Sequence, residues 1–230
     1  MAIEDDLRSE VKAILREQWQ TRDGRVVPEP ENLSLGNDAI KIDAVVLYAD
    51  LDESTKLVDN YKAPFAAEVY KCFLHCAARI IRDEGGVITA YDGDRIMAVF
   101  LGDNMYNCAA RTGLKINYAR EKVINPSIIE QYPNSPYEEK HVVGIDKSAL
   151  FIARTGVRGA NDLVWVGRSA NHAAKLCTLG NDYPTRITDV VFKGMDSTTR
   201  LGANGAPMWE ERTWTDMGRT IYRSNWWWKC

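Results

Sequence analysis

Two aspartates stand where strand-forming segments meet turns, and together they suit a divalent cation. Asp50 follows the apolar run 45–49, and Asp94 lies in a turn between residues 87–91 and 95–101. Carboxylate oxygens are the ligands that Mg²⁺ and Mn²⁺ prefer, and such ions commonly bind a triphosphate at the same time. The pair therefore favours phosphoryl-transfer chemistry.

The elements that must position these aspartates follow from hydrophobic periodicity and turn residues. The pattern predicts a strand over 40–49, a helix over 61–83 that stops at Gly85-Gly86, and a hairpin over 87–101. A second helix is predicted over 104–123, followed by a loop marked by Pro126, Pro133 and Pro136. Beyond the loop, the pattern predicts strands over 141–153 and 163–167, a helix over 169–178, and strands over 184–192 and near 209–228. This order predicts an α+β fold, with helices packed on a mostly antiparallel sheet.

The N-terminal region has a different character. Residues 4–20 carry apolar side chains at helical spacing, and residues 21–37 are rich in Pro, Gly and Asn, which is typical of a linker. We therefore expect an N-terminal helix and linker over 1–40 and one main domain over 41–230.

Composition excludes several classes of function. The net charge of −3 and a pI near 5.7 argue against nucleic acid and anionic membranes as partners. No segment reaches the roughly 18 apolar residues that a membrane span needs, and the first residues are acidic, unlike a signal peptide. A cytoplasmic protein is expected. Its five cysteines show no zinc-like spacing with histidine and are expected to be reduced, mostly buried thiols.

Three ordered motifs resemble the class III nucleotidyl cyclases. Residues 50–55 resemble the metal-binding first strand of that family, residues 85–100 its hairpin, and residues 164–176 its strand, glycine turn and catalytic helix. The resemblance covers about residues 43–192, and three motifs in order are far more specific than one. It implies a cyclase catalytic domain over 41–230.

The resemblance also implies the catalytic groups. Asp50 and Asp94 would hold two divalent ions, Mn²⁺ or Mg²⁺, with the backbone carbonyl of Leu51 as a further ligand. Asn171 would orient the ribose. Lys175 stands where the family usually has an arginine that stabilises the transition state, and lysine keeps the charge but loses the forked donor geometry.

Family members build their site across a two-fold dimer interface. One subunit supplies the aspartates, and the other supplies the Asn and the basic residue. Because this chain carries both halves, the resemblance implies a homodimer with two equivalent sites. Arg168 or Arg212 could assist Lys175 in binding phosphate.

The expected base pocket departs from both common patterns of the family. Adenylyl cyclases generally place Lys four residues before the second metal Asp, and Asp or Thr seven residues before the catalytic Asn; guanylyl cyclases place Glu and Cys there. This chain has Ala90 and Val164, whose side chains cannot hydrogen-bond a purine. A purine substrate is therefore disfavoured.

Larger side chains near these positions favour a smaller base. Tyr48, Tyr91 and Trp165 would narrow the pocket, although aromatic residues on strands usually pack in the core. Arg95, directly after the second metal Asp, is a donor that could reach a uracil carbonyl. These substitutions resemble the pyrimidine cyclases of the bacterial Pycsar antiphage system, and among them the uridylate cyclases.

That resemblance implies conversion of UTP to cyclic UMP, which activates a separate effector protein. Three alternatives stay open: a cytidylate cyclase, a divergent adenylate cyclase, and an inactive nucleotide-binding regulatory module. A diguanylate cyclase is disfavoured, because the Gly-Gly-Asp-Glu-Phe string of that class is absent. The run Trp226-Trp227-Trp228 is expected to pack on the domain or on a partner.

Overall fold

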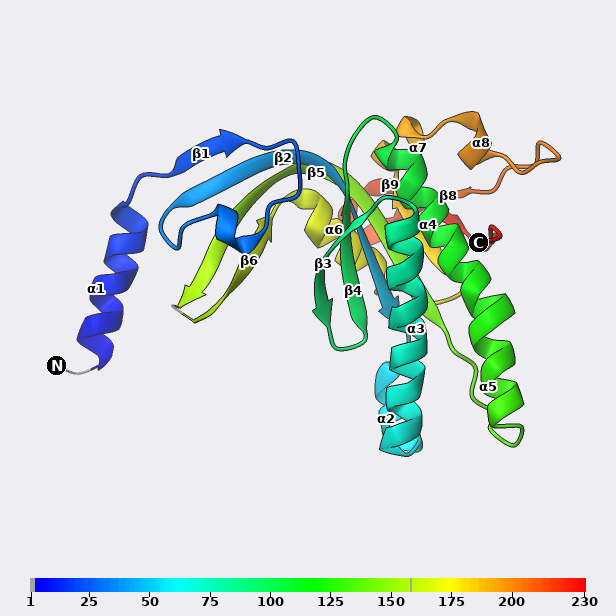
Figure 1. The fold of residues 1–230 in the computed structure, drawn as a ribbon. Helices are drawn as coiled ribbons and strands as arrows, with labels where there is room; N and C mark the ends of the chain where they lie inside the picture. Colours follow the sequence, from blue (N-terminus) through cyan, green and yellow to red (C-terminus); the bar gives the residue numbers. More distant parts are fainter. Residues whose placement is uncertain (1–2, 158) are drawn as a thin grey trace. The chain divides into compact units, whose positions relative to one another are not determined.

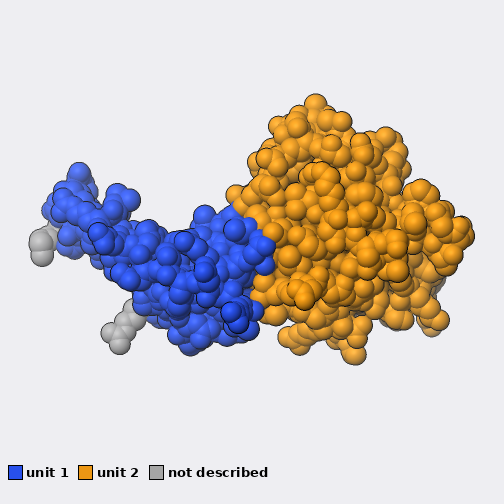
Figure 2. All heavy atoms as spheres, turned by 90° about the horizontal axis from the view of Figure 1, so that it is seen from above, with its two compact units in different colours: residues 1–43, 149–167 blue, residues 44–148, 168–230 orange. Residues whose placement is uncertain are grey.

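The computed structural model describes residues 3–157 and 159–230, and the chain divides into two compact units. Unit 1 consists of residues 1–43 and 149–167, and unit 2 consists of residues 44–148 and 168–230 (Figure 2). Two long strands, β2 (Asp38–Leu51) and β5 (His141–Val157), contribute residues to both units. The sequence predicts a division near residue 40 and does not anticipate that 149–167 belongs with the N-terminal segment.

Unit 1 combines the N-terminal helix with short strand pairs. Its further elements are α1 (Ile3–Arg16), β1 (Gln20–Asp23), the 3₁₀ turn η1 (Pro30–Asn32) and β6 (Ala160–Val166). The strand β1 pairs in parallel with β2 inside the segment that was expected to be a linker. Its residues are all exposed, so hydrophobic alternation could not reveal it. Backbone bonds hold it instead, such as Gln20 N–H to Asn37 O at 2.7 Å.

Unit 2 carries most of the helices and strands (Figure 1). Besides its parts of β2 and β5, it contains α2 (Ser54–Asn60), α3 (Ala63–Asp83), β3 (Val87–Asp92), β4 (Arg95–Phe100), α4 (Met105–Ala119), the π-helical turn η2 (Arg120–Ile124), α5 (Asn125–Gln131), α6 (Arg168–Leu176), β7 (Thr185–Thr188), α7 (Asp189–Gly194), α8 (Ser197–Arg200), β8 (Glu210–Trp214), the 3₁₀ turn η3 (Thr215–Met217) and β9 (Arg219–Ser224). The strand order is β3-β4-β2-β5-β7-β9-β8, and β5 with β7 is a parallel pair.

The main core of unit 2 lies between the sheet and the helices α3 and α4. Alternate residues of β2, from Val45 through Leu47 to Ala49, face this core, and Phe73 of α3 packs into it. Because side chains alternate along a strand, Tyr48 and Asp50 face the opposite side of the sheet. The core thus fixes which strand residues remain available for a site.

The turn after α3 confirms the predicted helix stop. Gly85 has φ +79, a left-handed conformation that favours glycine. A Cβ on Gly86 would lie 2.6 Å from the Phe100 ring, so glycine also lets the chain pass close to the hairpin. These two residues deliver the chain from α3 into β3.

Two predicted boundaries are wrong. Pro126 lies in a helix, not in a loop, because the helix continues from α4 through the π-helical turn η2 into α5, and such a turn can accommodate a proline that follows it. The predicted strand over 184–192 ends at Thr188 and continues as α7. Its apolar residues Val190 and Val191 fit both periodicities, which short runs cannot separate.

The C-terminal tryptophans differ in burial, as expected for a segment that packs on the domain. Trp226 and Trp228 pack against the main core, whereas Trp227 is 47% exposed and lies against Tyr118. Among the described residues, no helix has the length and apolarity that crossing a membrane requires.

Candidate functional site

Asp50 and Arg95 form an ion pair at the end of β2. They are direct partners in the antiparallel register of β2 and β4. The Arg95 Nη2 atom donates to Asp50 Oδ2 at 2.7 Å, and the side chains are 33% and 17% exposed respectively. The sequence prediction placed both residues at this site but did not foresee that they neutralise each other.

Asp94 brings a second carboxylate to the same place. It occupies the turn between β3 and β4, after Gly93 with φ +61. Burial raises the pKa of Asp50 above its usual value, the bond from Arg95 opposes this, and the negative charge of Asp94 raises the pKa further. The two carboxylates are therefore close enough to repel each other.

These carboxylates fit a divalent cation. The Oδ2 atom of Asp94 is buried and has no hydrogen-bond partner among the described residues. A buried unpaired oxygen is costly, and a cation would satisfy it. The described residues contain no group of three or more His, Cys, Asp or Glu that could hold a metal. Two aspartates suit Mg²⁺ or Mn²⁺ bound partly by substrate phosphates, because such ions keep several ligands from outside the protein.

Leu51 is the last residue of β2. Its side chain is only 3% exposed and packs in the main core. The predicted role of Leu51 belongs to its backbone carbonyl, and it stays a prediction.

Tyr48 and Ala90 lie on the same sheet face as Asp50. Both are register partners of Met97, on either side of β4. The Arg95 guanidinium carbon lies 5.9 Å from the centre of the Tyr48 ring. Burial raises the pKa of Tyr48, so its hydroxyl stays protonated and can donate. This face therefore brings together the Tyr48 ring, the Arg95 guanidinium and Asp50, the predicted metal ligand.

The structure does not bring Tyr91 to this face. Tyr91 pairs with Ile96, whose side chain belongs to the main core, and it is 57% exposed on the side of the sheet that α3 covers. The β-bulge between Ile88 and Ala90 determines which face of the sheet each following residue of β3 occupies. Val164 and Trp165 belong to β6 in unit 1, where Val164 pairs with Ala153 and is 39% exposed.

Asn171 and Lys175 share an exposed face of α6. They are one helical turn apart, and neither side chain has a hydrogen-bond partner among the described residues. No hydrogen bond or ion pair joins them to Asp50 or Asp94 within the described chain. Their exposure leaves both side chains available to a ligand.

The buried face of α6 is anchored by Asp146, which is fully buried on β5. Its carboxylate accepts from Thr188 Oγ1 at 2.5 Å and from Arg168 Nε at 3.1 Å, and it lies 3.2 Å from His172 Nδ1. Arg168 was expected to assist phosphate binding, and here it holds the start of the helix. The network fixes the direction in which the exposed face of α6 points.

Close packing sets the depth of α6 on the sheet. A Cβ on Gly144 of β5 would lie 2.1 Å from the Ala173 carbonyl oxygen and 2.8 Å from Leu176 Cβ. Just after the helix, Cys177 Sγ lies within hydrogen-bond reach of the Tyr48 carbonyl oxygen, at 3.6 Å. Burial raises the pKa of the Cys177 thiol to about 12. The end of α6 thus contacts the strand that carries Tyr48 and Asp50.

Some residues of this region could not be assigned from the sequence. Asp146, Thr188 and Gly144 lie on strands with ordinary patterns, and only the fold brings them to α6. Arg212, named as a phosphate ligand, pairs with Glu210 on β8 instead. The expectation that the cysteines are mostly buried is wrong: all five are free thiols, of which Cys177 is buried and Cys72 and Cys230 are exposed.

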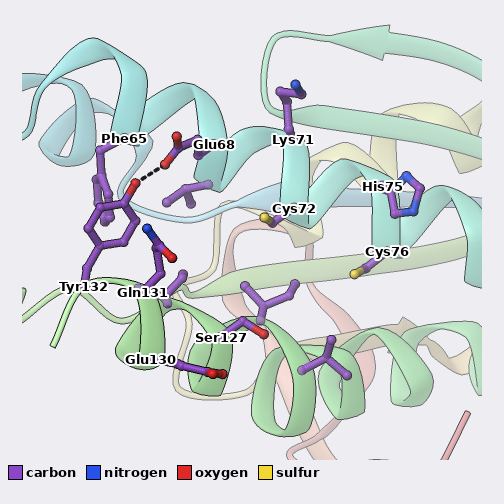
Figure 3. Close-up of a pocket in the computed structure, with 14 residues that line it drawn as sticks. Phe65, Glu68, Lys71, Cys72, His75, Cys76, Ser127, Glu130, Gln131 and Tyr132 are labelled. Atoms are coloured by element: carbon purple, nitrogen blue, oxygen red, sulfur yellow. Dashed lines mark hydrogen bonds between the residues drawn. The ribbon is translucent and has the colours of Figure 1, made fainter.

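A separate groove of about 680 Å³ lies between α3 and the segment η2–α5 (Figure 3). Its walls are largely apolar, and Tyr132 donates a hydrogen bond to Glu68 at one end, drawn dashed in the figure. None of the predicted site residues lines it. The groove is therefore distinct from the face that carries Asp50.

Known proteins resemble this chain along its whole length. A uridylate cyclase of Xanthomonas perforans is 49% identical over 231 residues, which cover 100% of this chain and 99% of that protein. A uridylate cyclase of Burkholderia cepacia is 48% identical, with 99% of each chain covered, and one of Rhodovulum sp. (strain MB263) is 35% identical, covering 99% of this chain and 98% of that one. No family model matches the chain.

Solved structures agree on the fold. The adenylyl cyclase CyaB from P. aeruginosa superposes with a TM-score of 0.67 at 17% identity, covering 81% of this chain and 95% of that chain. The guanylyl cyclase Cya2 gives a TM-score of 0.66 at 16% identity, covering 80% and 92%. The predicted class III cyclase fold is confirmed. The chain belongs to the uridylate cyclase family of nucleotidyl cyclases, enzymes that act as phosphorus–oxygen lyases.

Proposed function

We propose that this enzyme converts UTP to 3′,5′-cyclic UMP and pyrophosphate at the face formed by Asp50, Asp94, Tyr48 and Arg95. In the reaction, the ribose 3′-oxygen bonds to the α-phosphorus, the bond to the β-phosphate oxygen breaks, and the 3′-hydroxyl loses its proton. The observation that carries the proposal is the proximity of Asp50 and Asp94, since Asp94 Oδ2 is buried and has no hydrogen-bond partner in the described part of the chain. Full-length relatives named uridylate cyclases support the substrate.

Asp50 and Asp94 would hold the divalent ions, with the Leu51 carbonyl as a further ligand. When bound there, the ions would lower the pKa of the 3′-hydroxyl and neutralise the triphosphate. The two carboxylates stand on backbone fixed by the β2–β4 pairing, so their positions are set before the substrate arrives.

Asn171 would orient the ribose, and Lys175 would stabilise negative charge as it develops at the phosphate. Both extend from a helix that Asp146 and Gly144 hold in place, and no carboxylate of the described residues forms an ion pair with Lys175. Lysine binds phosphate here as a point charge.

Tyr48 and Arg95 would select the base. A tyrosine ring beside the aspartates would narrow the space for the base and so favour a pyrimidine, and a donor-only guanidinium favours carbonyl oxygens over an exocyclic amine. Ala90 contributes space without hydrogen bonds. Tyr91 and Val164 stay sequence predictions and are not part of this proposal, because Tyr91 lies on the opposite sheet face and Val164 belongs to unit 1.

We also propose a homodimer in which each site takes its aspartates from one subunit and Asn171 with Lys175 from the other. Mixing Asp50→Asn with Lys175→Ala subunits tests this. Random exchange would restore about a quarter of wild-type activity, because half of the dimers would then contain one intact site of two. No recovery, with subunit exchange verified by mass spectrometry, would place both halves in one chain.

The product would act as a cytoplasmic second messenger that activates a separate effector in antiphage defence. This part of the proposal rests on the resemblance of the base-pocket residues to the Pycsar cyclases. It needs no contact between the enzyme and the effector.

The decisive experiment incubates the purified protein with ATP, GTP, CTP or UTP and Mn²⁺, and identifies products by chromatography and mass. Cyclic UMP from UTP alone is expected, and the Asp50→Asn variant should give none. Cyclic CMP or cyclic AMP as the main product would overturn the base assignment. No product from any of the four would favour the nucleotide-binding module.

A further inference from the structure

The guanidinium of Arg95 already binds one carboxylate oxygen of Asp50, the proposed metal ligand. Its Nη2 atom donates to Asp50 Oδ2 at 2.7 Å, and the acceptor side chain is only 17% exposed. Partly buried charged pairs of this kind are stronger than surface pairs, because water screens them less. The aspartate is therefore neutralised by a cation of the protein itself.

The salt bridge to Asp50 does not satisfy all the hydrogen-bond donors of Arg95. The Arg95 Nε atom is buried and has no hydrogen-bond partner among the described residues. The carboxylate of Asp94, close by, likewise leaves its Oδ2 without a partner. The Arg95–Asp50 salt bridge thus leaves one donor, Arg95 Nε, and one acceptor, Asp94 Oδ2, without partners. A ligand that supplies these partners would stabilise the site.

The guanidinium and a divalent cation compete for Asp50. Both seek the same carboxylate, and two positive charges within a few ångströms in a partly buried site repel strongly. Asp50 and Asp94 supply two negative charges, of which Arg95 cancels one. A cation that enters must either tolerate this repulsion or drive the guanidinium away.

The guanidinium also lies near an aromatic ring on the same face while it is paired with Asp50. The Tyr48 ring is 5.9 Å from the Arg95 guanidinium carbon, within the range of a cation–π contact. The Arg95 side chain is 33% exposed, so its end can move without breaking the core. Leaving Asp50 would also release the guanidinium toward a bound nucleotide.

We propose that Arg95 is an internal counter-ion that competes with the divalent cation for Asp50 and holds the site metal-poor until the nucleotide arrives. The inference rests on the proposed function in one respect, the assignment of Asp50 as a metal ligand. Nucleotide and metal then bind together. The triphosphate brings its own cation, and the displaced guanidinium gains a negatively charged or carbonyl partner on the substrate.

Metal binding without nucleotide tests the proposal. Mn²⁺ is titrated into wild type, Arg95→Met and Lys56→Gln, and the free ion is followed by electron paramagnetic resonance. Lys56→Gln is the matched control, because Lys56 pairs with Glu53 on the neighbouring turn and its loss removes the same charge. Arg95→Met should bind Mn²⁺ about tenfold more tightly than wild type, and Lys56→Gln by less than about twofold.

Two results would overturn the inference. Equal or weaker Mn²⁺ binding by Arg95→Met would show that no competition exists, and equal tightening by Lys56→Gln would reduce it to general electrostatics. An Asp50→Asn variant distinguishes failure of the metal assignment itself. If that variant binds Mn²⁺ as well as wild type does, Asp50 is not a ligand, and the proposed function and the inference fall together.

A second measurement uses the unaltered protein, in case Arg95→Met does not fold. The Arg95 Nε–H resonance is identified by its loss in Arg95→Lys and followed in nitrogen-15 spectra as Mg²⁺ is added. The proposal expects this resonance to shift in proportion to bound Mg²⁺. A resonance that stays fixed while Mg²⁺ binds would show that the guanidinium does not leave Asp50, and would overturn the inference.

Discussion

The end of the β3–β4 hairpin and the helix α6 present their charges in opposite ways. Beside the hairpin, Asp50 of β2 is half-buried and already paired with Arg95 of β4. On α6, Asn171 and Lys175 are exposed and unpaired among the described residues, while Asp146 fixes the helix from behind. The comparison indicates that ligands must displace Arg95 from Asp50 before they bind at the hairpin, whereas Asn171 and Lys175 on α6 are available before any ligand binds.

The largest expected effect comes from the hairpin half. Replacing Asp94 by Asn should lower kcat by at least about a thousandfold, because the loss of a metal ligand removes several kcal/mol of transition-state stabilisation. Asp92→Asn, in the same turn, is the matched control and should stay within about threefold of wild type. Steady-state kinetics with UTP and Mn²⁺ measure both. Equal losses in the two variants would mean that the turn, and not the Asp94 carboxylate, matters.

On α6, Lys175→Ala should lower kcat by about a hundredfold while nucleotide affinity changes little, because the charge acts mainly in the transition state. Lys175 is exposed, so stability should not change. Isothermal calorimetry with a non-cyclising UTP analogue separates binding from turnover. Lys193→Ala, which removes another exposed helix lysine, serves as the control. A loss confined to nucleotide affinity would contradict the assigned role.

The packing beneath α6 can be broken without touching the aspartates. Gly144→Ala should lower the free energy of unfolding by about 3 kcal/mol, because its Cβ would meet backbone atoms of the helix that cannot move aside. Urea denaturation measures the loss. In the folded variant, turnover should fall while Mn²⁺ affinity stays at the wild-type value. A parallel loss of Mn²⁺ affinity would show that the two halves are not independent.

The smallest effect concerns acid stability. Burial lowers the pKa of His172 below its usual value; Asp146 opposes this, and Arg168 adds to it. The unfolded chain therefore takes up a proton near pH 6.5 when the folded protein does not. The free energy of unfolding should fall as pH drops below about 6.5 and level off below the folded pKa. His172→Gln should remove this slope in denaturation curves measured between pH 5 and 8, and an unchanged slope would assign it to other groups.

The sequence predicted the elements whose periodicity is long and clear. Residues 61–83 and the hairpin at 87–101 carry strong patterns and turn glycines, so α3, β3 and β4 were placed almost residue by residue. The strand β1 was missed, because its four exposed polar residues pair through their backbone alone. The predicted strand beyond Thr188 was wrong for a related reason, since a short apolar run fits a strand and a helix equally well.

The candidate site was predictable in its residues but not in its contacts. Asp50, Asp94 and Arg95 could be named from strand ends and turns, yet the Asp50–Arg95 pair depends on the register of β2 against β4. The phase of β3 depends on a bulge that no sequence pattern marks, and it places Tyr91 on the face opposite Ala90. Register and bulges are tertiary properties, so they need the fold.

Cys177 can report on opening of the packing between the end of α6 and β2. Its thiol is buried against the Tyr48 carbonyl and its pKa is raised to about 12, so alkylating reagents meet little thiolate there while the fold is closed. Cys72 and Cys230 are exposed and would be modified at once. The rate at which a thiol reagent later reaches Cys177 therefore reports how often the packing between the end of α6 and the strand that carries Asp50 opens in the native protein.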